Sequence, residues 1–512
     1  MKKRVGDKVI ELKEEKTLLS RFLITARKRP ESDLEHCIGN FEFSVVPKAL
    51  FSADGIPLAC LDKSKLIHGI EELASKEQTT NGLSGEVKTN KVIIIDGMAV
   101  VNQTPKTPAV KTCKDFASAF TERVLQISRG CDEIRLVFDR YIENSLKART
   151  RKHRTSGNEV RYKVSDNTNI SSISLKQFLS HIDTKQALTI YLAKKVMEAL
   201  SSLHIRYIVT YDTKMESNFV DCRIHDHEEA DTALIYNAMD GAQQSPFTSC
   251  IVYSPDSDVF LLLIYYYEML PINTIFRTGR GSTLPDIDIR NCFEALGAVH
   301  AKAILGFHTF TGCDQTGRFN KKSKSAWLKI FLQADNEVVL ALSTLGVLPN
   351  LETLESLERF VVSMYKGNKC PADVVSLSQL RWHLFSKFQC DADMLPPTLA
   401  ALKYKIFRCH FISMVLRSSH ILIQQLPNAI NYGWDTDEVG NLSPIMTDEL
   451  PAPLALIELS SCNCKTSCIS NRCKCRKNGF LCTDMCKCTT CQNSGGASDE
   501  SESDEYSSSD DE

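Results

Sequence analysis

Acidic residues in this 512-residue sequence recur directly after apolar runs that are typical of buried strands. Two such runs, VIIID and LVFD, end on an aspartate, and the run CIVY leads into SPDSD. The segment HEEADTALI places carboxylates at the expected start of a helix, and TGCDQTG follows the apolar segment AKAILGFHTF. The candidate set is Asp96, Asp139, Glu229, Asp231, Asp256, Asp258 and Asp314.

Carboxylates that meet in one cleft repel one another and raise each other's pKa. Divalent magnesium or manganese resolves this conflict, because hard cations prefer carboxylate oxygen and water as ligands. Two such ions about 4 Å apart can activate a water and stabilise the leaving oxygen of a phosphodiester. The set therefore predicts phosphodiester hydrolysis. The alternative is that each acid is a solvated loop end or a helix cap.

From residue 91 onward, strand-like and helix-like patterns alternate along the chain. This alternation predicts an α/β fold, in which a central, mostly parallel sheet is covered by helices on both faces. Ligands of such sheets bind beyond the carboxyl ends of the strands, which is where the acidic residues fall. The sequence thus predicts a three-layer α/β domain, followed by a helical extension and a small zinc-cluster module.

The motifs DG, VFD, EAD, DSD and GCD, in this order, resemble those of the flap-endonuclease-like nucleases of the PIN-like superfamily. The resemblance covers residues 91–330 and implies a PIN-like three-layer domain in which the whole acidic set is catalytic. It also implies two Mg²⁺ or Mn²⁺ ions, a two-metal mechanism and nucleic acid, with DNA favoured, as the substrate. The implied ligands of these ions are Asp96, Glu229, Asp231, Asp256, Asp258 and Asp314.

Two basic segments would contact nucleic acid if the resemblance holds. SLKARTRKHR stands where the resembled family forms an arch over single strands, and RFNKKSKSAW stands where the family grips duplex backbone. A solvated basic helix is the alternative for the first. The residues concerned are Lys147, Arg149, Arg151, Lys152, Arg154, Lys321, Lys322 and Lys324. His225, His227 and His308 are interpreted as ordinary histidines, not as ligands.

Nine cysteines crowd into residues 462–491. A segment this rich in cysteine has no room for an apolar core, and metal must therefore supply its folding energy. Zinc suits ligation by thiolates alone. Nine thiolates complete three tetrahedral Zn²⁺ ions if three of them bridge. The pattern is similar to the tesmin-type cysteine-rich (CXC) domain, which binds DNA in chromatin proteins; a structural or protein-binding knot is the alternative. The ligands are Cys462, Cys464, Cys468, Cys473, Cys475, Cys482, Cys486, Cys488 and Cys491.

Composition predicts an intracellular protein in a reducing compartment. The N-terminal segment lacks the apolar core of a secretory signal, and no run approaches the roughly 20 apolar residues of a membrane span. The 20 cysteines then favour metal ligation over disulfides. The predicted organisation is residues 1–90 without an assigned role, 91–330 nuclease domain, 331–455 helical extension and linker, 460–493 cysteine module, and 494–512 disordered acidic tail.

The leading hypothesis is a nuclear, metal-dependent nuclease that the zinc module tethers to DNA, with chromatin proteins as possible partners and no membrane association. The competing hypothesis is a catalytically inactive nuclease-fold scaffold on chromatin. The complete acidic set favours the enzyme, because a scaffold has no reason to hold repelling charges together. A phosphatase is disfavoured, since Asp96-Gly97-Met98 lacks a second aspartate two positions on.

Overall fold

The computed structural model of the chain divides into two compact units. Unit 1 comprises Met1–Gly55, Ala372–Ala401 and Thr447–Glu512, and unit 2 comprises Ile56–Pro371 and Leu402–Met446. The structure describes residues 2–5, 8–11, 19, 22–23, 33–60, 63–77, 90–142, 145–147, 160–244, 248–270, 273–279, 284–347, 353–367, 370–388, 394–437, 440–453, 462–465, 467–477, 482, 486–488 and 491–493.

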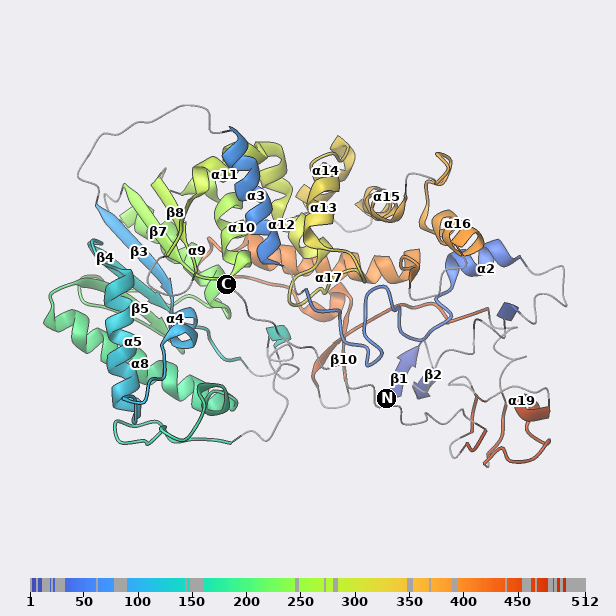
Figure 1. The fold of residues 1–512 in the computed structure, drawn as a ribbon, viewed down its shortest axis with the longest axis horizontal. Helices are drawn as coiled ribbons and strands as arrows, with labels where there is room; N and C mark the ends of the chain where they lie inside the picture. Colours follow the sequence, from blue (N-terminus) through green and yellow to red (C-terminus); the bar gives the residue numbers. More distant parts are fainter. Residues whose placement is uncertain are drawn as a thin grey trace. The chain divides into compact units, whose positions relative to one another are not determined.

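A seven-stranded sheet lies at the centre of unit 2, in the order β6-β5-β4-β3-β7-β8-β9 (Figure 1). The five inner strands, β5, β4, β3, β7 and β8, pair in parallel with one another. The edge strands β6 and β9 each pair antiparallel with their neighbour. The strand order reverses beside β3, so the carboxyl ends of β3 and β7 flank a switch point of the kind where such sheets bind ligands. The strands are β3 (Lys91–Asp96), β4 (Glu133–Val137), β5 (Arg206–Tyr211), β6 (Lys214–Ser217), β7 (Ser249–Tyr253), β8 (Asn273–Arg277) and β9 (Asp286–Asp288).

Helices cover both faces of this sheet, which explains why its central strands are apolar along their whole length. Residues 92–95 of β3 are all β-branched and fully buried, a continuous run rather than an alternating one. On one face α5 packs on α8 and α8 on β5, whereas α9 packs on β3, β4 and β7 (Figure 1). These helices are α5 (Cys113–Ile127), α8 (Ile182–Ser202) and α9 (Ala230–Gln244).

A further group of helices in unit 2 continues from the α9 side of the sheet. Helix α12 packs on α10, α11, α13 and α14, and α3, which comes from the segment before the sheet, packs on α10, α11 and α13. Residues of the region predicted to have no assigned role thus belong to the same compact unit as the sheet. The helices are α3 (Ser64–Glu77), α10 (Ser257–Tyr265), α11 (Ile289–Leu296), α12 (Ala298–Thr311), α13 (Lys324–Phe331), α14 (Asn336–Thr344) and α15 (Leu354–Tyr365).

Unit 1 contains a small helical core and the cysteine module. Helix α2 (Leu34–Asn40) packs on α16 (Leu377–Phe388), with Gly39 in close contact with Ser378. The buried Arg381 donates hydrogen bonds to the backbone oxygens of Ile38 and Phe41, which fastens the two helices together.

The predicted α/β class, with a mostly parallel central sheet between helices, is confirmed by the strand order and pairing of unit 2. The mainly helical character expected after residue 331 is found in α14, α15, α16 and α17 (Leu399–Arg417). None of the described helices combines the length and apolarity that crossing a bilayer requires. The predicted acidic tail, residues 494–512, lies outside the described residues.

Candidate metal centre

Asp96 ends β3 and caps the helix that follows it. Its Oδ1 accepts a hydrogen bond from the backbone N–H of Ala99 at 3.0 Å, which makes it the N-cap of α4 (Gly97–Gln103). Its Oδ2 accepts a hydrogen bond from the Ser254 hydroxyl at 3.2 Å, so the carboxyl ends of β3 and β7 are tied together. Burial raises the pKa of Asp96 to about 6, and the neighbouring Asp139 carboxylate adds to the rise.

Asp139 and Glu229 bring β4 and the start of α9 into the same cluster. Asp139 Oδ1 accepts a hydrogen bond from the Ala230 N–H at 2.8 Å. Glu229 Oε2 lies 2.9 Å from the Lys147 ammonium, and its Oε1 accepts a hydrogen bond from the Gln315 amide at 2.8 Å. Burial would lower the pKa of Lys147, but the surrounding carboxylates outweigh it and raise that pKa above its ordinary value. Lys147, predicted to bind nucleic acid, thus lies among the carboxylates.

Three carboxylates converge at the switch point. One oxygen each of Asp231, Asp256 and Asp258 lies within 4.8 Å of the others. Asp231 is in the first turn of α9, and Asp256 caps α10 by accepting a hydrogen bond from the Asp258 N–H at 3.0 Å. Burial, followed by repulsion from Asp258, raises the pKa of Asp256 to about 7. A cation bonded to oxygen at about 2.0–2.6 Å brings its ligands to this spacing, so the donor set fits Mg²⁺ or Mn²⁺.

Asp258 and Asp314 share a lysine, Lys63, that no sequence motif connects with them. The Lys63 ammonium lies 2.6 Å from Asp314 Oδ1 and 3.2 Å from Asp258 Oδ2. Although burial acts in the opposite direction, Lys63 and then His308 hold the pKa of Asp258 well below its usual value. Lys63 comes from a stretch without any recognisable motif, so only its three-dimensional position links it to the acidic set.

Two buried side chains, a histidine and a lysine, lie behind Asp258. His308 Nε2 is 3.2 Å from Asp258 Oδ1, and the Lys324 ammonium donates hydrogen bonds to the His308 backbone oxygen and the Thr311 hydroxyl, both at 2.8 Å. Burial, and then Lys324, lowers the pKa of His308 to about 4, so the ring is neutral at neutral pH. The prediction that Lys324 contacts nucleic acid is corrected, because this ammonium is fully buried and hydrogen-bonded within unit 2.

The other predicted nucleic-acid contacts fall into two groups. Lys321 is exposed, whereas the Lys322 ammonium donates a hydrogen bond to the Met364 backbone oxygen and lies 4.0 Å from the centre of the Tyr365 ring. Both stay predictions. The remaining four lie outside the described residues: Arg149, Arg151, Lys152 and Arg154.

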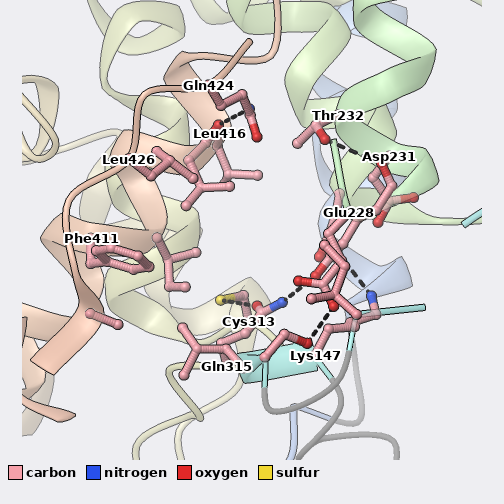
Figure 2. Close-up of a pocket in the computed structure, with 18 of the residues that line it drawn as sticks. Lys147, Glu228, Asp231, Thr232, Cys313, Gln315, Phe411, Leu416, Gln424 and Leu426 are labelled. Carbon is pink, nitrogen blue, oxygen red and sulfur yellow. Dashed lines mark hydrogen bonds and ion pairs between the residues drawn. The ribbon is translucent and has the colours of Figure 1, made fainter. Parts of the chain in front are cut away.

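A cavity of about 280 Å³ opens beside the carboxylates (Figure 2). One wall carries Asp231, Glu228 and Lys147, and the facing wall carries Phe411 and Leu426, which come from α17 and the segment after it. Leu416 lies on this second wall, and further apolar side chains line the cavity, namely Ile412, Val415 and Leu442. A charged wall opposite an apolar one suits a ligand that has both kinds of surface.

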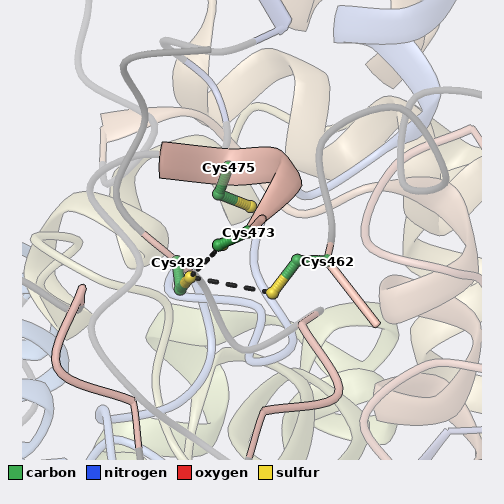
Figure 3. A group of neighbouring side chains, drawn as sticks. All are labelled: Cys462, Cys473, Cys475 and Cys482. Atoms are coloured by element: carbon green, nitrogen blue, oxygen red, sulfur yellow. Dashed lines mark hydrogen bonds between the residues drawn. The ribbon is translucent and has the colours of Figure 1, made fainter. Parts of the chain in front are cut away.

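The cysteine module brings its nine sulfurs together, and the hydrophobic cluster among its described residues consists of these cysteines. Cys462 and Cys482 each belong to three overlapping groups of four sulfurs within 4.8 Å, and together four such groups take in all nine cysteines. Sulfurs lie 3.8 Å apart between Cys462 and Cys482 and 3.7 Å apart between Cys473 and Cys482 (Figure 3). Tetrahedral zinc with bonds of about 2.3 Å separates its sulfurs by about 3.8 Å, so this spacing fits thiolate-bound zinc.

The comparisons with known proteins find matches among solved structures alone. No protein-family model and no curated protein matches the sequence. Among solved structures, the chain is similar to the T5 D15 protein co-crystallised with metal ions, at 11% identity and a TM-score of 0.30, over 65% of this chain and 97% of that one. It is also similar to the Rad2 catalytic core in complex with a DNA substrate, at 14% identity and a TM-score of 0.31, over 65% of this chain and 88% of that one.

A third similar structure is the bacteriophage T5 D15 flap endonuclease in a pseudo-enzyme-product complex with DNA and metal ions, at 10% identity and a TM-score of 0.31, over 64% of this chain and 98% of that one. TM-scores this low carry no conclusion about the chemistry of this chain. The proposals that follow therefore rest on its own strands, carboxylates and cysteines.

Proposed function

We propose that unit 2 is a divalent-metal-dependent nuclease that hydrolyses phosphodiester bonds of nucleic acid, with DNA as the favoured substrate. The observation that carries this proposal is the convergence of Asp231, Asp256 and Asp258 at the switch point of a parallel sheet. Among the described residues, no lysine or arginine forms an ion pair with Asp231 or Asp256, whereas Lys63 and Lys147 pair with other members of the acidic set. The charge of Asp231 and Asp256 is therefore available to a cation.

The residues that would hold the cation are Asp231, Asp256 and Asp258. When bound there, Mg²⁺ or Mn²⁺ would supply Lewis acidity toward a phosphodiester and lower the pKa of water. Asp96 holds the ends of β3 and β7 together through Ser254, and Lys147 provides a fixed positive charge toward a phosphate. The second ion that the acidic set predicts would need Asp258 and Asp314 as ligands.

Nucleic acid as the substrate is supported by the cavity beside the carboxylates. A nucleotide has an anionic phosphate and a base with an apolar face, and aromatic side chains such as Phe411 favour stacking with bases. The apolar wall would thus receive a base while the phosphate lies toward the acidic wall and its cation. A phosphodiester that carried no base would leave this apolar surface exposed to water.

The second candidate function is a non-catalytic scaffold, and one observation favours it. Lys63 bridges Asp258 and Asp314, as expected if protein cations balance the cluster. In that case divalent metal would not bind at the carboxylates. Metal binding therefore separates the two candidates directly.

For the cysteine module we propose a three-zinc cluster of the tesmin type that binds DNA. The sulfur spacing supports zinc, and six basic residues are exposed around the buried cysteines. Exposed Lys and Arg gain affinity for DNA by releasing its condensed counterions. Attachment to chromatin and a nuclear location follow from this role and stay predictions. The six residues are Lys465, Arg472, Lys474, Arg476, Lys477 and Lys487.

The proposed nuclease is tested by cleavage of a plasmid and a flap substrate with the zinc-loaded protein in Mn²⁺. Asp256→Asn and Asp258→Asn should each lower the rate by about 10²-fold or more, because loss of a metal ligand removes several kcal/mol of stabilisation. Asparagine keeps the oxygen with which Asp256 caps α10, so the helix itself should stay intact.

The matched control is Asp288→Asn. Asp288 caps α11 in the same manner, accepting a hydrogen bond from the Arg290 N–H at 2.8 Å, but it is not among the three carboxylates. Its variant should cleave like the wild type. Equal rates in all four proteins, or cleavage that persists in a chelator, would remove the nuclease proposal.

A further inference from the structure

Lys63 stands where the second cation of a two-metal site would have to bind. Its ammonium lies 2.6 Å from Asp314 Oδ1 and 3.2 Å from Asp258 Oδ2, and its side chain is only 15% exposed. A divalent ion bonded to both of these oxygens would lie about 2.0–2.6 Å from each. It would then be in contact with the ammonium, and two positive charges in so little solvent repel strongly.

The surrounding structure holds Lys63 in this position. Helix α3 begins at the next residue and packs on α10, α11 and α13, with Gly69 directly against the Leu328 side chain. On the other side, Arg318 donates hydrogen bonds to the backbone oxygens of Leu58 and Ala59, both at 2.8 Å. The chain around Lys63 is thus attached to the segment that carries Asp314.

The three-carboxylate group differs from the Lys63 position in this respect. Among the described residues, no lysine or arginine forms an ion pair with Asp231 or Asp256. Lys147 forms its ion pair with Glu229, and Lys63 forms ion pairs with Asp258 and Asp314. A cation can therefore approach Asp231 and Asp256 without displacing a protein ammonium group.

We propose that Lys63 replaces one of the two divalent cations, so that the carboxylate centre binds a single ion at Asp231, Asp256 and Asp258. Asp314 then serves as the partner of Lys63 and is not a metal ligand. This proposal rests on the proposed metal-dependent function. It assigns a role to a lysine from a segment without any recognisable motif.

The test counts Mn²⁺ ions by calorimetry and by electron paramagnetic resonance on the full, zinc-saturated chain. Ions bound at the carboxylate centre are those lost when Asp231, Asp256 and Asp258 are all changed to Asn, because Asp258 would belong to both positions. The wild type should bind one ion with an uncoupled manganese spectrum, and Lys63→Met should bind two that show magnetic coupling. Lys63→Arg keeps the charge and should bind one, as should Lys65→Met, which alters an exposed lysine in the first turn of α3.

A second variant decides the question even if Lys63→Met does not fold. Asp314→Asn should change the Mn²⁺ dissociation constant less than about threefold, whereas Asp256→Asn should raise it at least about a hundredfold, since a metal ligand is lost. Two ions in the wild type, one ion in Lys63→Met, or loss of an ion in Asp314→Asn would overturn the role of Lys63 and leave the proposed nuclease standing. No ion in the wild type would overturn the proposed nuclease itself.

Discussion

The carboxylate centre of unit 2 and the cysteine module of unit 1 both have the composition of metal sites, but they differ in what holds their ligands. Asp96 and Asp256 cap helices at the ends of fully buried strands, so hydrogen bonds and an apolar core fix them. Among the described residues of the module, the buried side chains are the cysteines and Asn493, whose amide donates a hydrogen bond to Cys482 Sγ, so no apolar core holds the sulfurs in place. We therefore expect the fold to build the first site before metal binds, and metal to build the second.

This difference has opposite consequences for stability. Metal-free carboxylates destabilise the fold that holds them, because burial and mutual repulsion raise the pKa of Asp256 and Asp231. Metal-free cysteines leave a segment with almost nothing to fold around. Removing a ligand should therefore stabilise metal-free unit 2 and abolish the folded state of the cysteine module.

The largest expected effect is the loss of the cysteine module. Cys482→Ser removes a sulfur common to three of the four sulfur groups, and structural zinc contributes about 10–16 kcal/mol to the folding of comparable peptides. We expect the variant to lose bound zinc and become protease-sensitive within residues 462–493, while the thermal unfolding of unit 2 is unchanged. Zinc content and limited proteolysis measure this.

Cys131→Ser is the control, since Cys131 is a half-buried free cysteine outside the module. It should retain all of its zinc. Full zinc content in Cys482→Ser, or a parallel fall in the melting temperature of unit 2, would break the contrast between the two sites.

A smaller effect is expected from a substitution in α12, the helix that precedes Asp314. Gly306 lies in α12, and a Cβ there would come within 1.9 Å of the Leu342 backbone oxygen in α14. Gly306→Ala must push the helices apart, which should cost about 1–3 kcal/mol of unfolding free energy, as overpacking does. Denaturant unfolding measures the loss, and zinc content should not change.

Gly367→Ala is the matched control, because a Cβ at this position meets no atom within 4 Å. It should unfold like the wild type. Equal stability of the two alanine variants would contradict the view that tight helix packing positions the carboxylate centre.

A third effect differs from the other two because it depends on pH, and it centres on Asp256. Its pKa is raised from 3.8 to about 7 in the folded chain, so its contribution to stability is fully present below about pH 3.8 and is lost as the pH rises through 7. In chelator, Asp256→Asn should therefore be more stable than the wild type at pH 8, by up to about 4 kcal/mol at roughly 1.4 kcal/mol per unit of pKa shift, and nearly equal to it at pH 4. Thermal unfolding of both proteins across this range measures the difference.

Taking the difference between the two proteins removes the contribution of other groups that titrate in the same range, such as the buried histidines. Added Mn²⁺ should reverse the order at pH 8, because only the wild type keeps the full ligand set. A difference that does not vary with pH would mean that Asp256 is not destabilised by its neighbours.

The sequence was sufficient to predict the central strands and the acids that follow them. Strands such as KVIIID are buried on both faces, so their composition alone identifies them, and the next residue is then at the edge of the sheet. The short edge strands β6 and β9 have mixed polar and apolar residues and carry no comparable signal. Their places depend on pairing with β5 and β8.

Contacts between distant segments explain what the sequence could not predict. Lys63 reaches Asp258 across 195 positions, and nothing near it in the sequence indicates a charge partner. Lys324 belongs to a basic run that resembles an exposed surface, yet the fold buries it against the His308 backbone. Conversely, Arg135 interrupts an apolar strand and is fully buried, because Glu133 and Asp240 lie within ion-pair distance.

The central claim is that the fold of unit 2 positions the metal ligands before metal binds. Its most direct test is X-ray diffraction at the manganese absorption edge from crystals of the zinc-loaded protein grown with Mn²⁺. The account predicts an anomalous peak between the carboxylate oxygens of Asp231, Asp256 and Asp258, with the strands and helices around it unchanged when the manganese is removed. Absence of manganese density among these three carboxylates at saturating Mn²⁺ would contradict it.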